Sequence, residues 1–158
     1  MGGGDSRLVD HLLARGVGCV CVLDVSDAAL QRARTRLGDA ADQALWIESD
    51  VIAEWSAPPV DIWHDRAVFH FLTAHDDQAH YIARLRQVLK RGGSAIIATF
   101  APDGPEKCSG LPVVRYSPEA LAERLGSDFG LVDSVRHVHE TPWGGRQSFQ
   151  YSRFTKLS

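Results

Sequence analysis

The sequence predicts an α/β protein whose doubly wound, mostly parallel sheet ends in a C-terminal antiparallel hairpin. Three observations predict this fold class. Short apolar runs alternate with helical patterns as far as residue 100, as expected for parallel strands joined by right-handed crossovers. A glycine-rich turn, Gly2–Gly4, opens the first helical pattern. The last two strand-like segments are joined by residues 141–145 alone, and a connection that short indicates an antiparallel pair.

The composition fits a globular protein with one domain spanning residues 1–158. A formal net charge of −3 argues against a nucleic-acid binder. No apolar run is long enough to span a bilayer, and no signal peptide is visible. Three cysteines favour a reducing compartment over a disulfide framework. We therefore expect a cytoplasmic protein that binds neither nucleic acid nor membranes.

The N-terminal elements follow directly from the glycine turn. Apolar residues at helical spacing predict a helix over residues 5–15, and an uninterrupted apolar run predicts a buried strand over 18–23. Ser26 is expected to cap a helix over 27–37, and a strand over 44–48 follows it.

The same alternation continues in the middle of the chain. A strand is predicted over residues 60–64 and a helix over 76–89. The run Lys90–Gly93 is expected to form a turn that leads into an apolar strand over 94–100.

The last third of the chain has a different character. Residues 101–116 form a polar loop rich in proline, followed by a helix over 117–125 with Pro118 in its first turn. Two strands, 130–140 and 146–155, complete the antiparallel hairpin.

The glycine turn is the expected centre of the chemistry. Glycines let the backbone approach a ligand closely, and Asp5 or Ser6 can cap a helix whose free N–H groups favour electron-rich atoms. Asp24 ends the next strand, twenty positions after Gly4. This spacing is typical of a nucleoside pocket in which the acid accepts the ribose hydroxyls.

Two ligands fit such a pocket, a dinucleotide and S-adenosylmethionine. The dinucleotide fingerprint would use Gly2 and Gly4, but Arg7 stands at its third glycine position. Asp5 would lie beside two negative phosphates, whereas carboxylates favour a positively charged sulfonium. Asp50, just after the strand over 44–48, can accept a hydrogen bond from the adenine amino group. These features favour S-adenosylmethionine.

The chain resembles the class I S-adenosylmethionine-dependent methyltransferases of bacterial small-molecule type over essentially its whole length. The resemblance rests on segments that occur in the family's order: Gly2–Ser6, Val22–Ser26, Ser49–Val51, Val60–Phe71 and Arg91–Gly93. It implies a Rossmann-like methyltransferase fold with strand order 3-2-1-4-5-7-6, in which the last strand is antiparallel.

The resemblance also implies which residues hold S-adenosylmethionine. They are Gly2, Gly3, Gly4 and Asp5 at the methionine end, Asp24 and Val25 at the ribose, Asp50 and Val51 at the adenine, and His64, Asp65 and Arg66 beside the ligand.

The family's first strand, which lies in the middle of its sheet, has no counterpart here, because only Met1 precedes the glycine turn. Without that strand, its two neighbours in the sheet are left with exposed pairing edges. A start codon assigned too far downstream is the favoured explanation. The alternatives are a homodimer whose partner completes the sheet, and a non-catalytic remnant.

The acceptor side is expected after the strand over 60–64 and in the C-terminal third. His64 and His70 are the candidates to take a proton from the acceptor, although His70 can equally pack between its phenylalanine neighbours. Four further residues are candidate substrate contacts: Cys108, Arg115, Tyr116 and Trp143. The alternative roles are a plain loop thiol for Cys108, a solvated charge for Arg115 and a cap on the core for Trp143.

No metal site is expected. The spacing of His64, Asp65 and His70 matches no strong ligand pattern. Cys19 and Cys21 share a strand face, but no further cysteine pair is near, so they are interpreted as buried apolar cysteines.

The favoured function is methyl transfer from S-adenosylmethionine to a small-molecule acceptor. A protein lysine is an alternative acceptor. The alternative class is a truncated or non-catalytic nucleotide-fold protein. A dehydrogenase is less favoured, because the third glycine is absent and a terminal hairpin is present.

Overall fold

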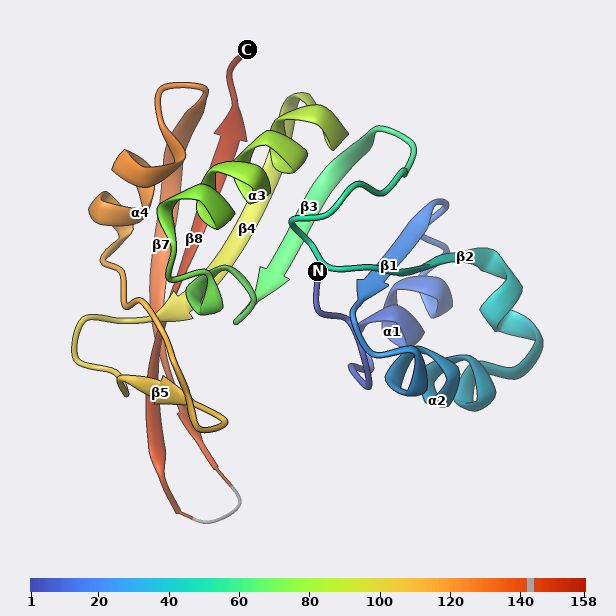
Figure 1. Cartoon of the computed structure of the whole chain (residues 1–158). Coiled ribbons are helices and arrows are strands. Elements are labelled where there is room, and N and C mark those ends of the chain that lie inside the picture. Colours follow the sequence, from blue (N-terminus) through green and yellow to red (C-terminus); the bar gives the residue numbers. More distant parts are fainter. Residues whose placement is uncertain (142–143) are drawn as a thin grey trace. The chain divides into compact units, whose positions relative to one another are not determined.

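The computed structural model describes residues 1–141 and 144–158, and the chain divides into two compact units, residues 1–58 and 59–158 (Figure 1). We call them unit 1 and unit 2 and describe each by itself. Within the described ranges, no helix is long and apolar enough to cross a membrane.

Unit 1 consists of a parallel pair of strands and the helices that accompany it. Its elements are α1 (Leu8–Ala14), β1 (Val20–Asp24), α2 (Asp27–Leu37), the 3₁₀ helix η1 (Gly38–Gln43) and β2 (Ala44–Glu48). β1 and β2 are parallel, with Val20 opposite Ala44 and Asp24 opposite Glu48. The predicted alternation is confirmed here, although α1 begins three residues later than the expected start at Asp5.

The core of unit 1 forms on one face of β1. Val20 and Val22 are buried together with Val9 of α1 and Leu30 of α2. Ser26 caps α2 as predicted, because its hydroxyl accepts the N–H of Ala29 at 3.2 Å. Successive side chains of a strand point to opposite faces, so Cys19 and Cys21 lie on the face away from this core.

One expectation for this face is wrong. Cys19 was interpreted as a buried apolar cysteine, but it is exposed, and Cys21 is only half-buried. The helices of unit 1 pack on the side of the valines, which leaves the cysteine side without the same cover.

Unit 2 is built on a mixed sheet. Its elements are β3 (Val60–Arg66), η2 (Phe69–Phe71), α3 (His75–Val88), β4 (Leu89–Phe100), β5 (Lys107–Cys108), β6 (Leu111–Pro112), α4 (Pro118–Leu125), β7 (Phe129–Glu140) and β8 (Arg146–Lys156). The main sheet has the order β3-β4-β8-β7. β3 and β4 are parallel, whereas β8 is antiparallel to both of its neighbours.

This arrangement confirms the predicted fold class and the terminal hairpin. The order β3-β4-β8-β7 is the 4-5-7-6 half of the expected strand order, with β8 inserted antiparallel. Among the strands that the structure describes, β1 pairs only with β2, and β3 pairs only with β4 on its side of the sheet.

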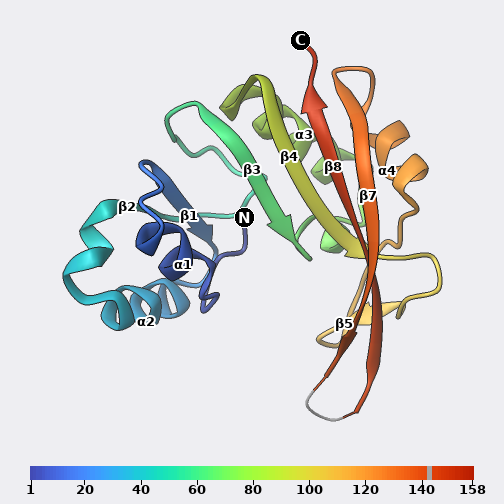
Figure 2. The same cartoon turned by 180° about the vertical axis from the view of Figure 1, so that it is seen from behind.

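The two faces of the unit 2 sheet differ. Helices α3 and α4 lie on one face (Figure 1), over the buried side chains of Ala95, Ile97 and Phe154. The opposite face is turned to the viewer in Figure 2, and none of the described helices of unit 2 crosses it. We call it the open face; it carries Ile62 and Val135, which are 63% and 62% exposed.

Two predicted boundaries need correction. Lys90–Gly93 was expected to form a turn before the strand, but these residues belong to β4 as an irregularity: a single residue, Asp61, stands opposite them between the pairs Val60–Leu89 and Ile62–Ser94. The loop over 101–116 also contains a small antiparallel hairpin, in which β5 pairs with β6.

The irregularity in β4 generates a stability prediction for Gly93→Ala. A Cβ at Gly93 would lie 2.8 Å from the Lys90 carbonyl oxygen and 2.9 Å from that of Asp61. Because backbone atoms cannot move aside as a flexible side chain can, we expect the free energy of unfolding to fall by about 1–3 kcal/mol. Urea denaturation measures this change.

Gly18→Ala is the matched control, since nothing lies within 4 Å of a Cβ at that position. Its free energy of unfolding should stay level or rise by up to about 1 kcal/mol. Equal stability of the two variants would contradict the crowding at Gly93.

Candidate functional site

The glycine turn packs directly against the C-terminal end of β1. The Gly3 N–H donates to the Leu23 carbonyl at 3.1 Å, and the Ser6 N–H donates to the Gly3 carbonyl at 2.8 Å. A Cβ at Gly3 would lie 2.5 Å from Cγ1 of Val22. This distance leaves no room for a side chain, so the close approach of turn and strand requires glycine.

The same turn lies beside the carboxylate of Asp24. Gly4 has φ +24, and a Cβ there would lie 2.9 Å from Oδ2 of Asp24. The other oxygen, Oδ1, accepts the Ser26 N–H at 2.9 Å, which orients the carboxylate. The space that a Cβ at Gly4 would fill thus adjoins a fixed carboxylate oxygen, and this fits a ligand that offers hydroxyl groups.

Asp50 reaches the same end of unit 1. The Ser49 N–H donates to the Asp24 carbonyl at 3.0 Å, so the segment after β2 is joined to the end of β1. Asp50 itself is exposed, and its Oδ1 accepts the Ile52 N–H at 3.1 Å. Val51 is buried, whereas Val25, directly after β1, is exposed. The glycine turn and the segment that carries Asp50 are therefore both hydrogen-bonded to the end of β1.

Asp5 does not cap α1 as expected. Its carboxylate forms a bidentate ion pair with Arg32 of α2, with a shortest N–O distance of 2.7 Å. This hydrogen-bonded guanidinium lowers the pKa of Asp5. Ser6 is closer to the prediction, since its Oγ accepts the Leu8 N–H at 3.2 Å, although Arg7 is the N-cap residue.

The end of β3 is organised by a buried carboxylate. Asp65 is completely buried, and it accepts the N–H groups of Val68 at 2.8 Å and Phe69 at 3.1 Å. The Tyr81 hydroxyl donates to it at 2.6 Å and accepts the indole N–H of Trp63 at 2.8 Å. Burial raises the pKa of Asp65, and these hydrogen bonds oppose the rise. Asp65 has no exposed surface, unlike the ligand-flanking position expected for it.

Arg66 lies on the opposite face from Asp65, so the two side chains do not pair. Its Nε donates to the Tyr151 hydroxyl at 3.1 Å, and its guanidinium carbon lies 5.3 Å from the centre of the Phe149 ring. The next residue, Ala67, has φ 66, an uncommon conformation for a residue with a side chain. Backbone strain of this kind is concentrated at functional sites.

The two candidate histidines have different environments. His64 is half-buried on the open face, and its pKa is lowered by burial and also by the charge of Arg66. His70 is completely buried, with Nδ1 accepting the Phe100 N–H at 3.4 Å and Nε2 lacking a hydrogen-bond partner among the described residues. Burial lowers the pKa of His70 to about 4. Both rings are therefore neutral at pH 7.

The candidate substrate residues do not converge on one place. Cys108 packs against the cluster formed by Ala98, Phe100 and Phe149. Arg115 donates to the Gly104 carbonyl and to Glu106 within its own loop. Tyr116 is buried in the core, where its hydroxyl accepts the Gln78 amide at 3.1 Å. Trp143 lies outside the described residues.

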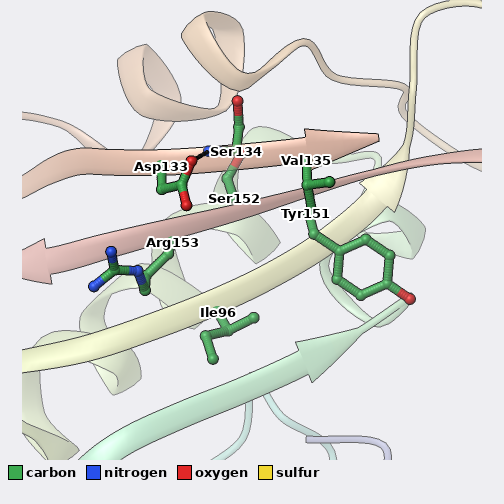
Figure 3. A pocket seen from close by; sticks show the side chains of 7 residues that line it. All are labelled: Ile96, Asp133, Ser134, Val135, Tyr151, Ser152 and Arg153. Atoms are coloured by element: carbon green, nitrogen blue, oxygen red, sulfur yellow. Dashed lines mark hydrogen bonds between the residues drawn. The ribbon is translucent and has the colours of Figure 1, made fainter. Parts of the chain in front are cut away.

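The open face also carries aromatic residues that sequence reasoning missed. A shallow hollow there is lined by Ile96, Asp133, Ser134, Val135, Tyr151, Ser152 and Arg153 (Figure 3). The Tyr151 ring reaches from β8 toward the end of β3 (Figure 3). Its hydroxyl accepts the hydrogen bond from Nε of Arg66. Phe149 and Tyr151 are two positions apart on the last strand, a spacing that predicts that the two rings share one face of the sheet.

Comparison with protein families matches residues 1–95 to a family described as a methyltransferase domain. The chain belongs to this family. The resemblance to class I S-adenosylmethionine-dependent methyltransferases is thereby confirmed, and the Rossmann-like fold agrees with it. Comparison with curated proteins gave no match.

Solved structures of similar fold include three methyltransferases. A 1,6-didemethyltoxoflavin-N1-methyltransferase from Burkholderia thailandensis, with bound S-adenosylhomocysteine, has a TM-score of 0.77 and 22% identity over 99% of this chain and 69% of its own. A methyltransferase from Methanosarcina mazei has a TM-score of 0.76 and 13% identity, covering 99% and 90%. A glycopeptide N-methyltransferase complexed with S-adenosylmethionine has a TM-score of 0.72 and 16% identity, covering 99% and 80%.

The environment of His70 generates a prediction for stability against pH. Its pKa is about 4 in the folded chain and about 6.5 when unfolded. A base whose pKa is lowered by folding stabilises the fold at pH values above the pKa that it has in the unfolded chain. This contribution is lost as the pH falls toward 4. Wild type should therefore lose up to about 3 kcal/mol more than His70→Asn between pH 7 and pH 4.

His70→Asn keeps an acceptor near the Phe100 N–H but does not titrate, so urea denaturation of both proteins at each pH isolates the histidine. His80→Asn, at an exposed position of α3, is the control and should behave as wild type. Parallel pH profiles of wild type and His70→Asn would contradict this account.

Proposed function

We propose that this chain transfers a methyl group from S-adenosylmethionine to a small-molecule acceptor. The observation that carries the proposal is the close packing of the glycine turn on β1, which leaves the Asp24 carboxylate beside Gly4. Methyltransferase family membership supports the reaction class. The structures of similar fold that contain S-adenosylmethionine or S-adenosylhomocysteine support the choice of methyl donor.

Each part of the donor site has a proposed task. Gly2, Gly3 and Gly4 line the methionine end, where the absence of side chains admits the ligand. Asp24 accepts the two ribose hydroxyls, and Asp50 accepts the adenine amino group. When bound, S-adenosylmethionine supplies an electrophilic methyl group on a sulfonium.

Val25 and Val51 flank these acids in the sequence and are proposed to contact the ribose and the adenine. Asp5 already pairs with Arg32 at 2.7 Å. Any effect of Asp5 on a sulfonium ligand is therefore exerted through a neutralised pair and is proposed to be minor.

His64 is proposed to deprotonate the acceptor, and Arg66 is proposed to orient it. Burial and the charge of Arg66 lower the pKa of His64. The imidazole is therefore neutral at pH 7, which is the form that can accept a proton. Asp65 acts as a positioning residue, because it holds the chain after β3 through Val68 and Phe69. His70 supports the loop over 101–116, since its carbonyl accepts the Val114 N–H at 2.8 Å.

The open face supports a small acceptor. The Arg66 guanidinium lies over the Phe149 ring and is hydrogen-bonded to Tyr151, which gives a wall with a flat apolar surface and a charged edge. Cys108 packs against the cluster of Ala98, Phe100 and Phe149, which includes the ring under Arg66. Two of the structures of similar fold are named as methyltransferases of 1,6-didemethyltoxoflavin and of a glycopeptide.

The donor proposal predicts the effect of Asp24→Asn on binding of S-adenosylmethionine. The amide keeps an oxygen for the Ser26 N–H but loses the charge that holds the ribose hydroxyls. Hydrogen bonds to a charged group contribute about 1.5–3 kcal/mol each, so we expect the dissociation constant to rise by about 10- to 100-fold. Isothermal titration calorimetry measures it.

Asp27→Asn is the matched control. Asp27 lies in the first turn of α2, where its exposed carboxylate accepts a hydrogen bond from the Gln31 side-chain amide at 3.1 Å. Binding by Asp27→Asn should equal that of wild type. A folded wild-type chain that releases no heat on titration would overturn the donor site.

The acceptor proposal predicts where a labelled methyl group goes. The purified chain is incubated with methyl-labelled S-adenosylmethionine and a bacterial extract, which is then separated into small molecules and protein by ultrafiltration. Label above the level of an Asp24→Asn control is expected in the small-molecule fraction. Label that depends on the enzyme but stays with protein would instead support a protein lysine acceptor.

A further inference from the structure

The cysteine pair of unit 1 forms a cluster that the methyl-transfer site does not use. Cys19 directly precedes β1 and Cys21 lies within it, so both side chains leave the same face of the strand. This is the face opposite the core formed by Val20 and Val22. Both cysteines are free thiols.

The two cysteines are neighbours on that face, two residues apart along the strand. Burial, followed by the neighbouring Cys19 thiol, raises the pKa of Cys21 to about 11. Cys19 is exposed, so an ion or reagent reaches the pair from solvent. Leu45, which stands opposite Cys21 on β2, is also exposed, and this leaves the approach over the sheet open.

The ligand set restricts which ions the pair can hold. Among the residues that the structure describes, no three histidine, cysteine, aspartate or glutamate side chains are grouped to hold a metal ion. A structural zinc site requires four such ligands. Two thiolates alone suit a soft ion that can be coordinated by two sulfur donors, such as copper(I).

We propose that Cys19 and Cys21 form a binding site for a soft, thiophilic metal ion of the copper(I) type, held between the two sulfurs. Binding replaces two S–H bonds by two metal–sulfur bonds and releases two protons to solvent. A monocation and two thiols thus become a dithiolate complex with a charge of −1, and no atom changes oxidation state. The site is independent of the methyl-transfer proposal, because it uses none of the residues assigned there.

Anaerobic titration of the full, reduced chain with copper(I) against a chromophoric copper(I) chelator tests this site. Wild type should take one ion at the pair with an affinity that competes with the chelator. Removing one thiol turns chelation into single-point binding, and a short tether between two sites corresponds to a millimolar effective concentration. Cys19→Ser should therefore bind at least about 100-fold more weakly.

Cys108→Ser is the matched control, because Cys108 is a half-buried thiol in unit 2 with no cysteine beside it. It should bind copper(I) as wild type does. Loss of binding in Cys108→Ser, or unchanged binding in Cys19→Ser, would overturn the proposal, as would a wild-type chain that fails to compete.

A second measurement guards against effects of misfolding. Phenylarsine oxide bridges two adjacent thiols with loss of one water, so intact-mass analysis should show one such adduct on wild type and Cys108→Ser but none on Cys19→Ser. Far-ultraviolet circular dichroism should show the same folded content in all three. An adduct on wild type without copper(I) binding would confirm that the thiols are adjacent and still refute the metal site.

Discussion

The buried carboxylate of Asp65 is the constraint on which unit 2 depends. Burying a charge is costly unless it is hydrogen-bonded, and here the N–H groups of Val68 and Phe69 and the Tyr81 hydroxyl all point at it. These contacts join the end of β3 to α3 and determine where the chain turns after the strand. Since neighbouring residues of a strand point to opposite faces, placing Asp65 inward places Arg66 on the open face, against Phe149 and Tyr151.

A steric constraint has the corresponding role in unit 1. Gly3 is so close to Val22 that a single methyl group would overlap it, and Gly4 is almost as close to the Asp24 carboxylate. The turn is held there by the hydrogen bond from Gly3 to Leu23. Hydrogen bonding and close approach together place one carboxylate oxygen of Asp24 beside the glycine backbone at the end of the sheet, and these are the elements of a nucleoside site in α/β proteins.

Secondary structure could be predicted from the sequence, whereas the exposure of single residues could not. Apart from the start of α1, the segment Lys90–Gly93 and the β5–β6 hairpin, the strands and helices were predicted correctly, because the period of apolar residues is a local property and hydrophobic burial follows it. The Ser26 cap was equally local. Tyr116 and Cys19 were misjudged, because their exposure is set by distant elements: Tyr116 is covered by Gln78 of α3, whereas the cysteine face of β1 lies away from the helices that cover Val20 and Val22.

The sequence by itself determined the order of elements, the glycine turn, and the acids at the ends of β1 and β2, since each depends on residues close together in the chain. Only the tertiary structure decided which side of β3 faces the core. It thereby separated Asp65, a buried anchor, from Arg66, an exposed wall of the candidate acceptor site. It also decided that Phe149 and Tyr151 of the last strand meet Arg66 of β3. That contact spans 85 residues of sequence, and only the pairing of β4 with both strands brings it about.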